Sequence, residues 1–515
     1  MKSENLKFYH PSWYTDGEGF SYISHNDLDI SLYFVTDVLD LKAQRERITL
    51  DHGDIFPFRA HWGRAGTYYT ADGMIKFLPF KSDLKLDVRS TLMGEARKVP
   101  FEATITAMQP KYTKKKRDFD SADAQMVRGI GSLDVNPRSN ELLFTALGDM
   151  WVQDGAADAQ NIDVDSVGQV NDPTWSADGS RIAFVAERDG QMDIWVRNVL
   201  NGDERRLTND KGREYRISWS RDGSKIAYLS TRDLSNTWGR ADVKVIDVEY
   251  GNIQVVDEYI FTPGRPIWAM DGEHILMAAV KPATSRFREG MHIIRQYHVE
   301  SGRIKNFDMP NDLGLSTRDG SGPVLSPDGA KLAYISEGEV RAVTVDMSGN
   351  ITDTIANMCV DVAHMPRWKM NSEDVVYLSG STLKTCNVRT GVVTTQNVNL
   401  NWSRDIADEK TIHVGRFFDG ISDEMRNNVD VFIRDGRIVK IRDHGTDEAI
   451  GEMIDHSSDS MIPGIMAGHT HQTELLGERL GRNWLSYGIT SVRDPGTNPY
   501  KSLMRKETWE SVNQK

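Results

Sequence analysis

An alternation of apolar and polar residues, interrupted by Asp-Gly pairs, recurs through the first part of the chain. Its three clearest copies are the segments 173–184, 216–228 and 323–334. In each copy a Trp or Leu lies three positions before the Asp of the Asp-Gly pair, and Ile/Leu-Ala-Phe/Tyr begins four positions after it. Glycine tolerates the positive φ angle of a tight turn, and the alternation on either side matches the two-residue period of a strand. Each copy therefore predicts a β-hairpin.

Fainter copies of the same pattern extend the series in both directions. Three begin at Pro11, Pro266 and Pro366, and two degenerate ones lie at 60–69 and 132–144, which gives eight copies. From residue 138 onward their turns are roughly 40 to 57 residues apart. One blade of this size cannot bury its own aromatic face, so several must close into a ring. The sequence predicts a mainly β chain in which residues 1–401 form a multi-blade β-propeller of about seven to eight repeats.

The pattern changes after residue 401. Residues 428–442 alternate around a central Asp-Gly pair and predict one more hairpin. A short apolar segment at 461–467 is followed by helical spacing at 475–487 and by the β-branched segment 488–494. The order strand, helix, strand predicts the first units of a parallel (β/α)8 barrel. In such barrels the reactive side chains lie at the C-terminal ends of the strands.

His469 and His471 stand at the end of the first of these strands. Residues i and i+2 of an extended segment share one face, so the two imidazoles can reach the same cation. Neutral imidazole is the commonest protein ligand for zinc and similar ions. The alternative is a polar turn that follows a buried strand. We interpret the pair as candidate metal ligands.

The residues around the pair carry a resemblance to the amidohydrolase superfamily. Pro463-Gly464, two apolar residues and the His-x-His pair resemble the end of that superfamily's first barrel strand, and 488–494 resembles its second strand. Ala467 departs from the pattern, because the superfamily has an aspartate there. The resemblance implies a small β-sandwich part at 402–459, followed by the start of a metal-dependent barrel at 460–515.

The same resemblance implies an activity. The expected reaction is hydrolysis of a carbon–nitrogen bond in a small amide, cyclic amide or dipeptide-like substrate, by water activated on one or two divalent ions, with zinc the expected metal. His469 and His471 would hold the more buried ion, and Asp494 would shape its loop. A whole barrel needs roughly 250 residues, whereas 52 follow Pro463. The resemblance therefore places the general base and the other ligands beyond residue 515, and leaves this chain catalytically incomplete.

The repeats themselves resemble the TolB-like and WD40-like (PD40) propellers, whose signature is matched by Ser326-Pro327-Asp328-Gly329. A TolB-like propeller fused to an amidohydrolase barrel resembles a class of large bacterial hydrolases that usually begin with a signal peptide. We therefore expect a fragment truncated at both ends, and a periplasmic or secreted location for the intact protein. The alternative is a non-enzymatic propeller platform that docks a protein partner.

Composition narrows these expectations. A net charge of −13 argues against a nucleic-acid partner, and no apolar run is long enough for a membrane span. The absence of a Gly-x-Ser-x-Gly motif argues against a propeller-bearing serine peptidase. Cys359 and Cys386 are too few for a disulfide framework, and we expect buried free thiols. Asp163, Asp165 and Asp172 lack the glycine spacing of a calcium loop and are interpreted as an acidic loop.

Overall fold

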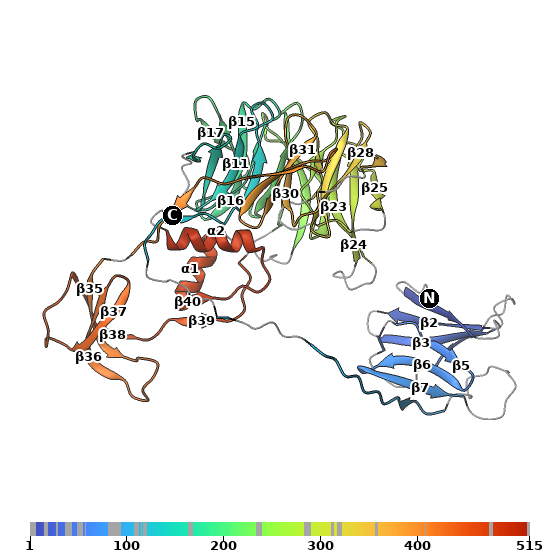
Figure 1. Cartoon of the computed structure of the whole chain (residues 1–515), viewed down its shortest axis with the longest axis horizontal. Coiled ribbons are helices and arrows are strands. Elements are labelled where there is room, and N and C mark those ends of the chain that lie inside the picture. The colour runs from blue at the N-terminus through green and yellow to red at the C-terminus, as the bar shows by residue number, and fades with distance from the viewer. Residues whose placement is uncertain are drawn as a thin grey trace. The chain divides into compact units, whose positions relative to one another are not determined.

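The computed structural model forms two compact units, one built mainly from residues 1–116 and the other from residues 117 onward (Figure 1). The residues that the structure describes are 7–14, 19–26, 29–36, 44–48, 55–56, 58–80, 94–107, 113–114, 116, 121–162, 168–232, 239–282, 290–310, 314–316, 322–355, 359–406, 408–472 and 477–511. Asp163 and Asp165 lie outside them.

The first unit contains two four-stranded antiparallel sheets among its described residues. They are β1 (Lys7–Trp13), β2 (Gly19–Asn26), β3 (Asp29–Thr36) and β4 (Gln44–Arg47), and β5 (His61–Gly63), β6 (Gly66–Ala71), β7 (Met74–Pro79) and β8 (Arg97–Lys98). Residues of both sheets share one apolar core, in which Phe34 lies 4.9 Å from Trp62 between ring centroids. The indole nitrogen of Trp62 donates to Ser21 Oγ at 2.9 Å.

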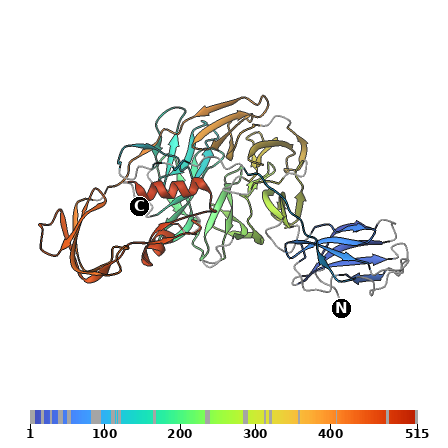
Figure 2. The ribbon, with the colours of Figure 1, turned by 60° about the horizontal axis from the view of Figure 1, so that its bottom comes forward.

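The second unit contains a ring of four-stranded sheets, six of which lie in the described residues (Figures 1 and 2). The first three are β10 (Ser132–Val135), β11 (Leu142–Ala146), β12 (Asp149–Gln153) and β13 (Gln160–Asn161); β14 (Val170–Trp175), β15 (Arg181–Arg188), β16 (Gln191–Asn198) and β17 (Glu204–Arg206); and β18 (Glu214–Trp219), β19 (Lys225–Ser230), β20 (Arg240–Asp247) and β21 (Ile253–Phe261). The others are β22 (Ile267–Trp268), β23 (His274–Pro282), β24 (Gly290–His298) and β25 (Ile304–Phe307); β26 (Val324–Leu325), β27 (Lys331–Ser336), β28 (Glu339–Val345) and β29 (Ile351–Thr354); and β30 (His364–Trp368), β31 (Asp374–Ser379), β32 (Thr382–Asn387) and β33 (Val393–Gln396).

The ring is closed. The first strand of each sheet contacts the first strand of the next, and β30 of the last sheet contacts β10 of the first. Outside the blades, β9 (Gln125–Met126) pairs with β34 (Asn401–Trp402) and so joins the start of the ring to its end. The predicted mainly β propeller is confirmed. Two of the eight copies of the sequence pattern fall in the first unit, and six fall in this ring. The domain limits predicted at residues 401 and 459 stay predictions.

The repeat has a clear structural basis. In the turns, an aspartate accepts hydrogen bonds from the serine two residues before it and from the amide two residues after it, as at Asp178, Asp222 and Asp328. The signature tryptophan then links neighbouring blades, because its indole nitrogen donates to a carbonyl on or beside the first strand of the preceding sheet. These bonds are Trp219 to Thr174 (3.1 Å), Trp268 to Ser218 (3.3 Å) and Trp368 to Val324 (3.0 Å).

The expectation of free thiols is wrong. Cys359 and Cys386 form a disulfide, with Cα atoms 6.1 Å apart, in an apolar core shared by the fifth and sixth blades of the ring. Cys359 lies outside the blade strands and makes an isolated bridge to Val340 of β28, whereas Cys386 belongs to β32. The spacing of the two cysteines in the sequence does not reveal this proximity.

The last hundred residues form two smaller elements. β35 (Lys410–Phe417), β36 (Arg426–Arg434), β37 (Arg437–Asp443) and β38 (Glu452–Met461) make a sheet in the order β37-β36-β35-β38, with β38 parallel to β35. The hairpin predicted at 428–442 is confirmed, with positive φ at Asp435 and Gly436.

The final element is a βαβ unit followed by a helix. It consists of β39 (Ile465–Ala467), α1 (Arg479–Ser486), β40 (Ile489–Val492) and α2 (Pro499–Glu510), with β39 and β40 parallel. The predicted order of strand, helix and strand is therefore present. In the described residues this parallel sheet has two strands, so its extension into a barrel stays a prediction. None of the helices described is long and apolar enough to cross a membrane.

Candidate metal centre

The candidate centre lies in the loop that follows β39. Thr470 points inward, where its amide and hydroxyl both donate to the carbonyl of Arg493, at 2.9 and 3.2 Å. His469 and His471, on either side of this buried threonine, are both exposed. Their ring centroids are 5.3 Å apart with 64° between the ring planes. The two imidazoles thus lie side by side, as the alternation of the sequence predicts, although they follow the strand rather than belong to it.

Asp494 fixes the shape of this loop. One carboxylate oxygen accepts the amide of Gln472 at 2.7 Å, and the other accepts the amides of Gly496 and Thr497 at 3.0 and 2.8 Å. Burial would raise the pKa of Asp494, but the hydrogen bonds from Thr497, Gly496 and Gln472 outweigh it and lower this pKa. Asp494 therefore ties the end of the second strand to the segment that carries the histidines, which is the loop-shaping role expected for it.

The donor set fits a metal in part. Two imidazoles suit zinc and related ions, but a catalytic zinc normally takes three protein ligands and a water. Within the described residues, no third His, Cys, Asp or Glu places a ligand atom beside this pair. His469 and His471 can thus supply two ligands, and their assignment to a metal stays a prediction.

Two buried glutamates attach the βαβ unit to the propeller. Glu187, at the end of β15, accepts the amide of Glu478 at 2.6 Å and a guanidinium N–H of Arg482 at 2.7 Å. It thereby places a carboxylate at the N-terminus of α1, where the helix dipole favours negative charge. In the other direction, Glu507 of α2 accepts the amides of Gly129 and Arg128, at 2.9 and 3.1 Å. Each partner therefore supplies a carboxylate to backbone amides of the other.

Small residues allow α2 to approach the propeller backbone closely. A Cβ atom on Gly129 would overlap the backbone of Met504, and one on Gly131 would overlap the sulfur of the same methionine. Arg505 extends the contact, since its guanidinium donates to the carbonyl of Gly477 at 2.9 Å and to Gln169 Oε1 at 3.3 Å. Figure 1 shows α2 lying along one end of the propeller. This attachment is not predictable from the sequence, because Glu507 and Arg505 resemble ordinary surface residues of a helix.

A buried charge network lies on the first strands of the blades, near α2. Asp172, interpreted from the sequence as part of an acidic loop, is buried in strand β14, and that interpretation is wrong. Its carboxylate accepts from Arg265 at 2.9 Å and from the amide of Arg216 at 2.7 Å. Burial would raise the pKa of Asp172, but the charges of Arg265 and Lys501 outweigh it and lower this pKa to about 2. Lys501 belongs to α2, so the helix interacts electrostatically with the middle of the ring.

The comparisons with known proteins agree with this architecture. The model of the TolB beta propeller domain (PD40) matches residues 109–372. No curated protein matches the chain.

Several solved structures are similar to the chain at low sequence identity. A putative TolB from Agrobacterium tumefaciens is 21% identical with a TM-score of 0.35, over 44% of this chain and 79% of its own. TolB from Acinetobacter baumannii is 17% identical with a TM-score of 0.38, over 52% and 62%. A puromycin-hydrolyzing peptidase of Mycobacterium tuberculosis is 12% identical with a TM-score of 0.37, over 97% and 68%. On the strength of the domain match, which covers half of its length, the chain belongs to the TolB-like β-propeller family.

Proposed function

We propose that this chain is the propeller-bearing part of a metal-dependent hydrolase of the amidohydrolase type, acting on carbon–nitrogen bonds of small amide or dipeptide-like substrates. One observation carries the proposal. Two exposed imidazoles lie side by side after the first strand of a parallel βαβ unit, in a loop that Asp494 holds in shape. This is the end of a parallel strand at which enzymes of such folds place their reactive groups.

The residues of the chain have distinct parts in this proposal. His469 and His471 would hold a divalent ion, and Asp494 keeps their loop in position. A bound ion of this kind supplies a water of lowered pKa and polarises the scissile carbonyl. The proposal requires a third ligand and a general base from outside the described residues.

The propeller would hold this unit in a fixed position. Glu187 and Glu507 connect the ring to both helices that follow the histidines. Fixed placement of a catalytic unit preserves the alignment on which rate depends. The buried disulfide supports a periplasmic or secreted location, because disulfides persist in oxidising compartments.

A second candidate function is a docking platform for a protein partner. The turn between the third and fourth strands carries an exposed apolar residue in four of the described blades. These residues are Leu200, Tyr250, Met347 and Val392, which are 96%, 72%, 59% and 60% exposed. Apolar side chains repeated at one position of a ring favour contact with another macromolecule. Pull-down with Leu200→Ser and Tyr250→Ser variants would test this candidate.

The hydrolase proposal is tested on the gene product that contains this chain. The protein is loaded with Zn²⁺ and assayed for release of amine from a panel of small amides and dipeptides. We expect hydrolysis that is abolished by a chelator and by His469→Ala or His471→Ala. His456→Ala is the matched control, because His456 is an exposed histidine that contacts Asp459 elsewhere in the chain. Hydrolysis that survives both the chelator and the two variants would refute the proposal.

A further inference from the structure

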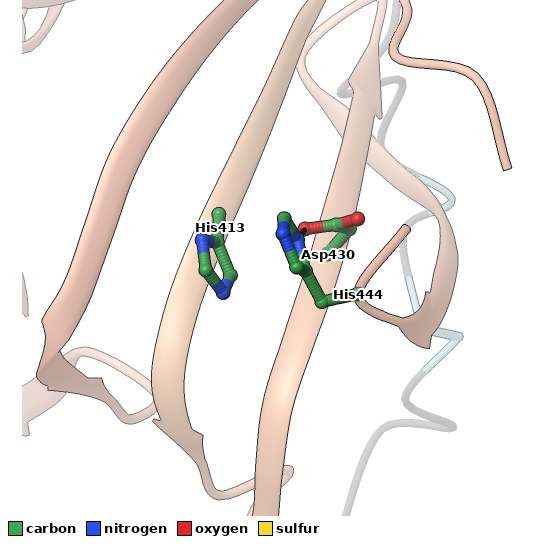
Figure 3. Close-up of side chains that lie close together, drawn as sticks. All are labelled: His413, Asp430 and His444. Atoms are coloured by element: carbon green, nitrogen blue, oxygen red, sulfur yellow. Dashed lines mark hydrogen bonds and ion pairs between the residues drawn. The ribbon is translucent and has the colours of Figure 1, made fainter. Parts of the chain in front are cut away.

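A second group of histidines lies on one face of the β35–β38 sheet. His413 of β35 is directly opposite Asp430 of β36 and, on its other side, opposite Asp455 of β38. His444 follows the end of β37 and lies beside Asp430 (Figure 3). Directly opposed residues of neighbouring strands have Cβ atoms only about 5 Å apart. The register of the sheet therefore brings these four side chains into one row.

The row is tightly packed and partly buried. Asp430 is 2% exposed, His413 is 8% exposed, and the side chain of His444 is 39% exposed. His444 Nδ1 is 2.9 Å from Asp430 Oδ1, and the two imidazole rings are stacked with centroids 3.6 Å apart. One ligand atom from each of the three residues lies within 4.8 Å of the other two.

The charge of Asp430 needs a partner in this position. A buried carboxylate is costly unless it is neutralised or fully hydrogen-bonded. Its second oxygen accepts the amide of Gly445 at 3.1 Å, and its first oxygen lies 2.9 Å from Nδ1 of His444. Two histidines and one carboxylate are a donor set that zinc and other borderline divalent ions accept.

The surroundings also match those of a metal ligand. Histidines that bind metal usually hydrogen-bond through the other ring nitrogen, which fixes their orientation. His413 Nε2 is 2.9 Å from Asn428 Oδ1 and would keep this contact. Its Nδ1, which is 3.3 Å from a carboxylate oxygen of Asp455, would exchange that contact for the ion. Asp455 is exposed at the edge of the group and can approach a bound ion.

Binding requires one rearrangement. Two parallel stacked rings cannot both direct a nitrogen lone pair at the same ion, so one ring must leave the stack. His444 is the residue able to do so, because it lies in the turn after β37 and is partly exposed, whereas His413 is buried in the central strand. We propose that His413, Asp430 and His444 form a second divalent-cation site, selective for Zn²⁺ or an ion of similar preference, that binds the end of β37 to β35.

The test separates this site from the strand-end pair, which consists of His469 and His471. A chain carrying His469→Ala and His471→Ala is titrated with Zn²⁺ by calorimetry, and bound metal is counted after gel filtration. We expect one equivalent to remain bound, and at least a tenfold loss of affinity when His444→Ala is added. His456→Ala added instead should leave the affinity unchanged. The result does not depend on the hydrolase proposal, because neither variant set requires turnover.

A further variant distinguishes metal binding from simple packing. His444→Cys removes the ring stack and the contact with Asp430 Oδ1 but supplies a thiolate, which binds zinc well. Retention of Zn²⁺ by this variant would support direct ligation. The proposal is overturned if the His469/His471 double variant binds no Zn²⁺ at neutral pH, or if its binding is indifferent to His444→Ala.

Discussion

The two histidine groups of this protein are built in opposite ways. His469 and His471 are two positions apart in one loop, and both are exposed. His413, Asp430 and His444 span 31 positions, come from three segments, and are mostly buried. The first group is a local motif held by backbone contacts, and the second is assembled by strand register. Residues of a local motif can be substituted with little loss of stability. Substitution in an assembled group is expected to destabilise the fold, because the group is part of the core.

The disulfide also joins two separate segments of the chain, and its loss should have the largest effect. Cys386→Ala removes a cross-link between residues 27 positions apart. Loop-closure entropy of the unfolded chain predicts a loss of about 3–4 kcal/mol in unfolding free energy. Urea unfolding followed by tryptophan fluorescence would measure it. Dithiothreitol should destabilise the natural protein to a similar extent and leave the variant unaffected. Equal midpoints for the oxidised protein and the variant would contradict the expectation.

The sequence predicts the parts of the propeller that depend on local chemistry. Asp-Gly turns and alternating strands identify the hairpins because turn geometry and the strand period act within a few residues. Closure of the ring is a different matter, since β9 and β34 pair residues 125–126 with residues 401–402. No local signal specifies that pairing, nor the separation of the first two sheets into another unit.

The same distinction applies to the two sites. The spacing of His469 and His471 is sufficient to place them side by side, and the structure does so. The opposition of His413 and Asp430 depends on the length of the connection between β35 and β36, because a one-residue shift would move Asp430 to the other face. The attachment of α2 was hidden for a related reason. Glu507 receives its partners from amides 378 and 379 positions away.

Asp430→Ala should produce the next largest effect. The substitution leaves the amide of Gly445 and Nδ1 of His444 without their acceptor. Buried groups that lose a partner cost about 1–3 kcal/mol each, so we expect about 2–3 kcal/mol of local destabilisation in the β35–β38 sheet. Hydrogen exchange of the amides of β36 and β37 would report it. Asp459→Ala, which removes an exposed carboxylate of the same sheet, is the control. Unchanged exchange in Asp430→Ala would show that Asp430 and its histidine neighbours do not stabilise the β35–β38 sheet.

The attachment of α2 through Glu507 should depend on pH. Burial raises the pKa of Glu507, and the hydrogen bonds from Gly129 and Arg128 offset only part of that increase. A carboxyl whose folded-state pKa is raised stabilises the fold most below its ordinary value, and this contribution is lost as pH rises through the raised pKa. We therefore expect α2 to be better protected from proteolysis at pH 4.5 than at pH 7.5.

Two variants separate this effect from general acid sensitivity. Glu507→Gln keeps an acceptor for the amides but cannot ionise. The difference in protection of α2 between pH 4.5 and pH 7.5 should therefore shrink. Glu507→Ala removes the acceptor and should weaken the attachment of α2 by about 1–3 kcal/mol at either pH. Lys506→Ala, an exposed neighbour that pairs with Glu510, serves as the control. Better protection at pH 7.5 than at pH 4.5 would reverse the expected sign.

The smallest effect should come from the residues with the largest proposed role. His469→Ala and His471→Ala remove exposed side chains from a loop whose shape depends on Thr470 and Asp494. Exposed substitutions of this kind change the free energy of unfolding by less than about 0.5 kcal/mol. Thermal unfolding without metal would test this expectation, with Asp494→Asn as the contrast, because that change weakens acceptors for three amides. Destabilisation by His469→Ala comparable to that of Asp430→Ala would mean that the strand-end histidines support the fold. Both histidine groups would then support the fold. His469 and His471 would no longer behave as ligand positions, whose replacement leaves the free energy of unfolding nearly unchanged.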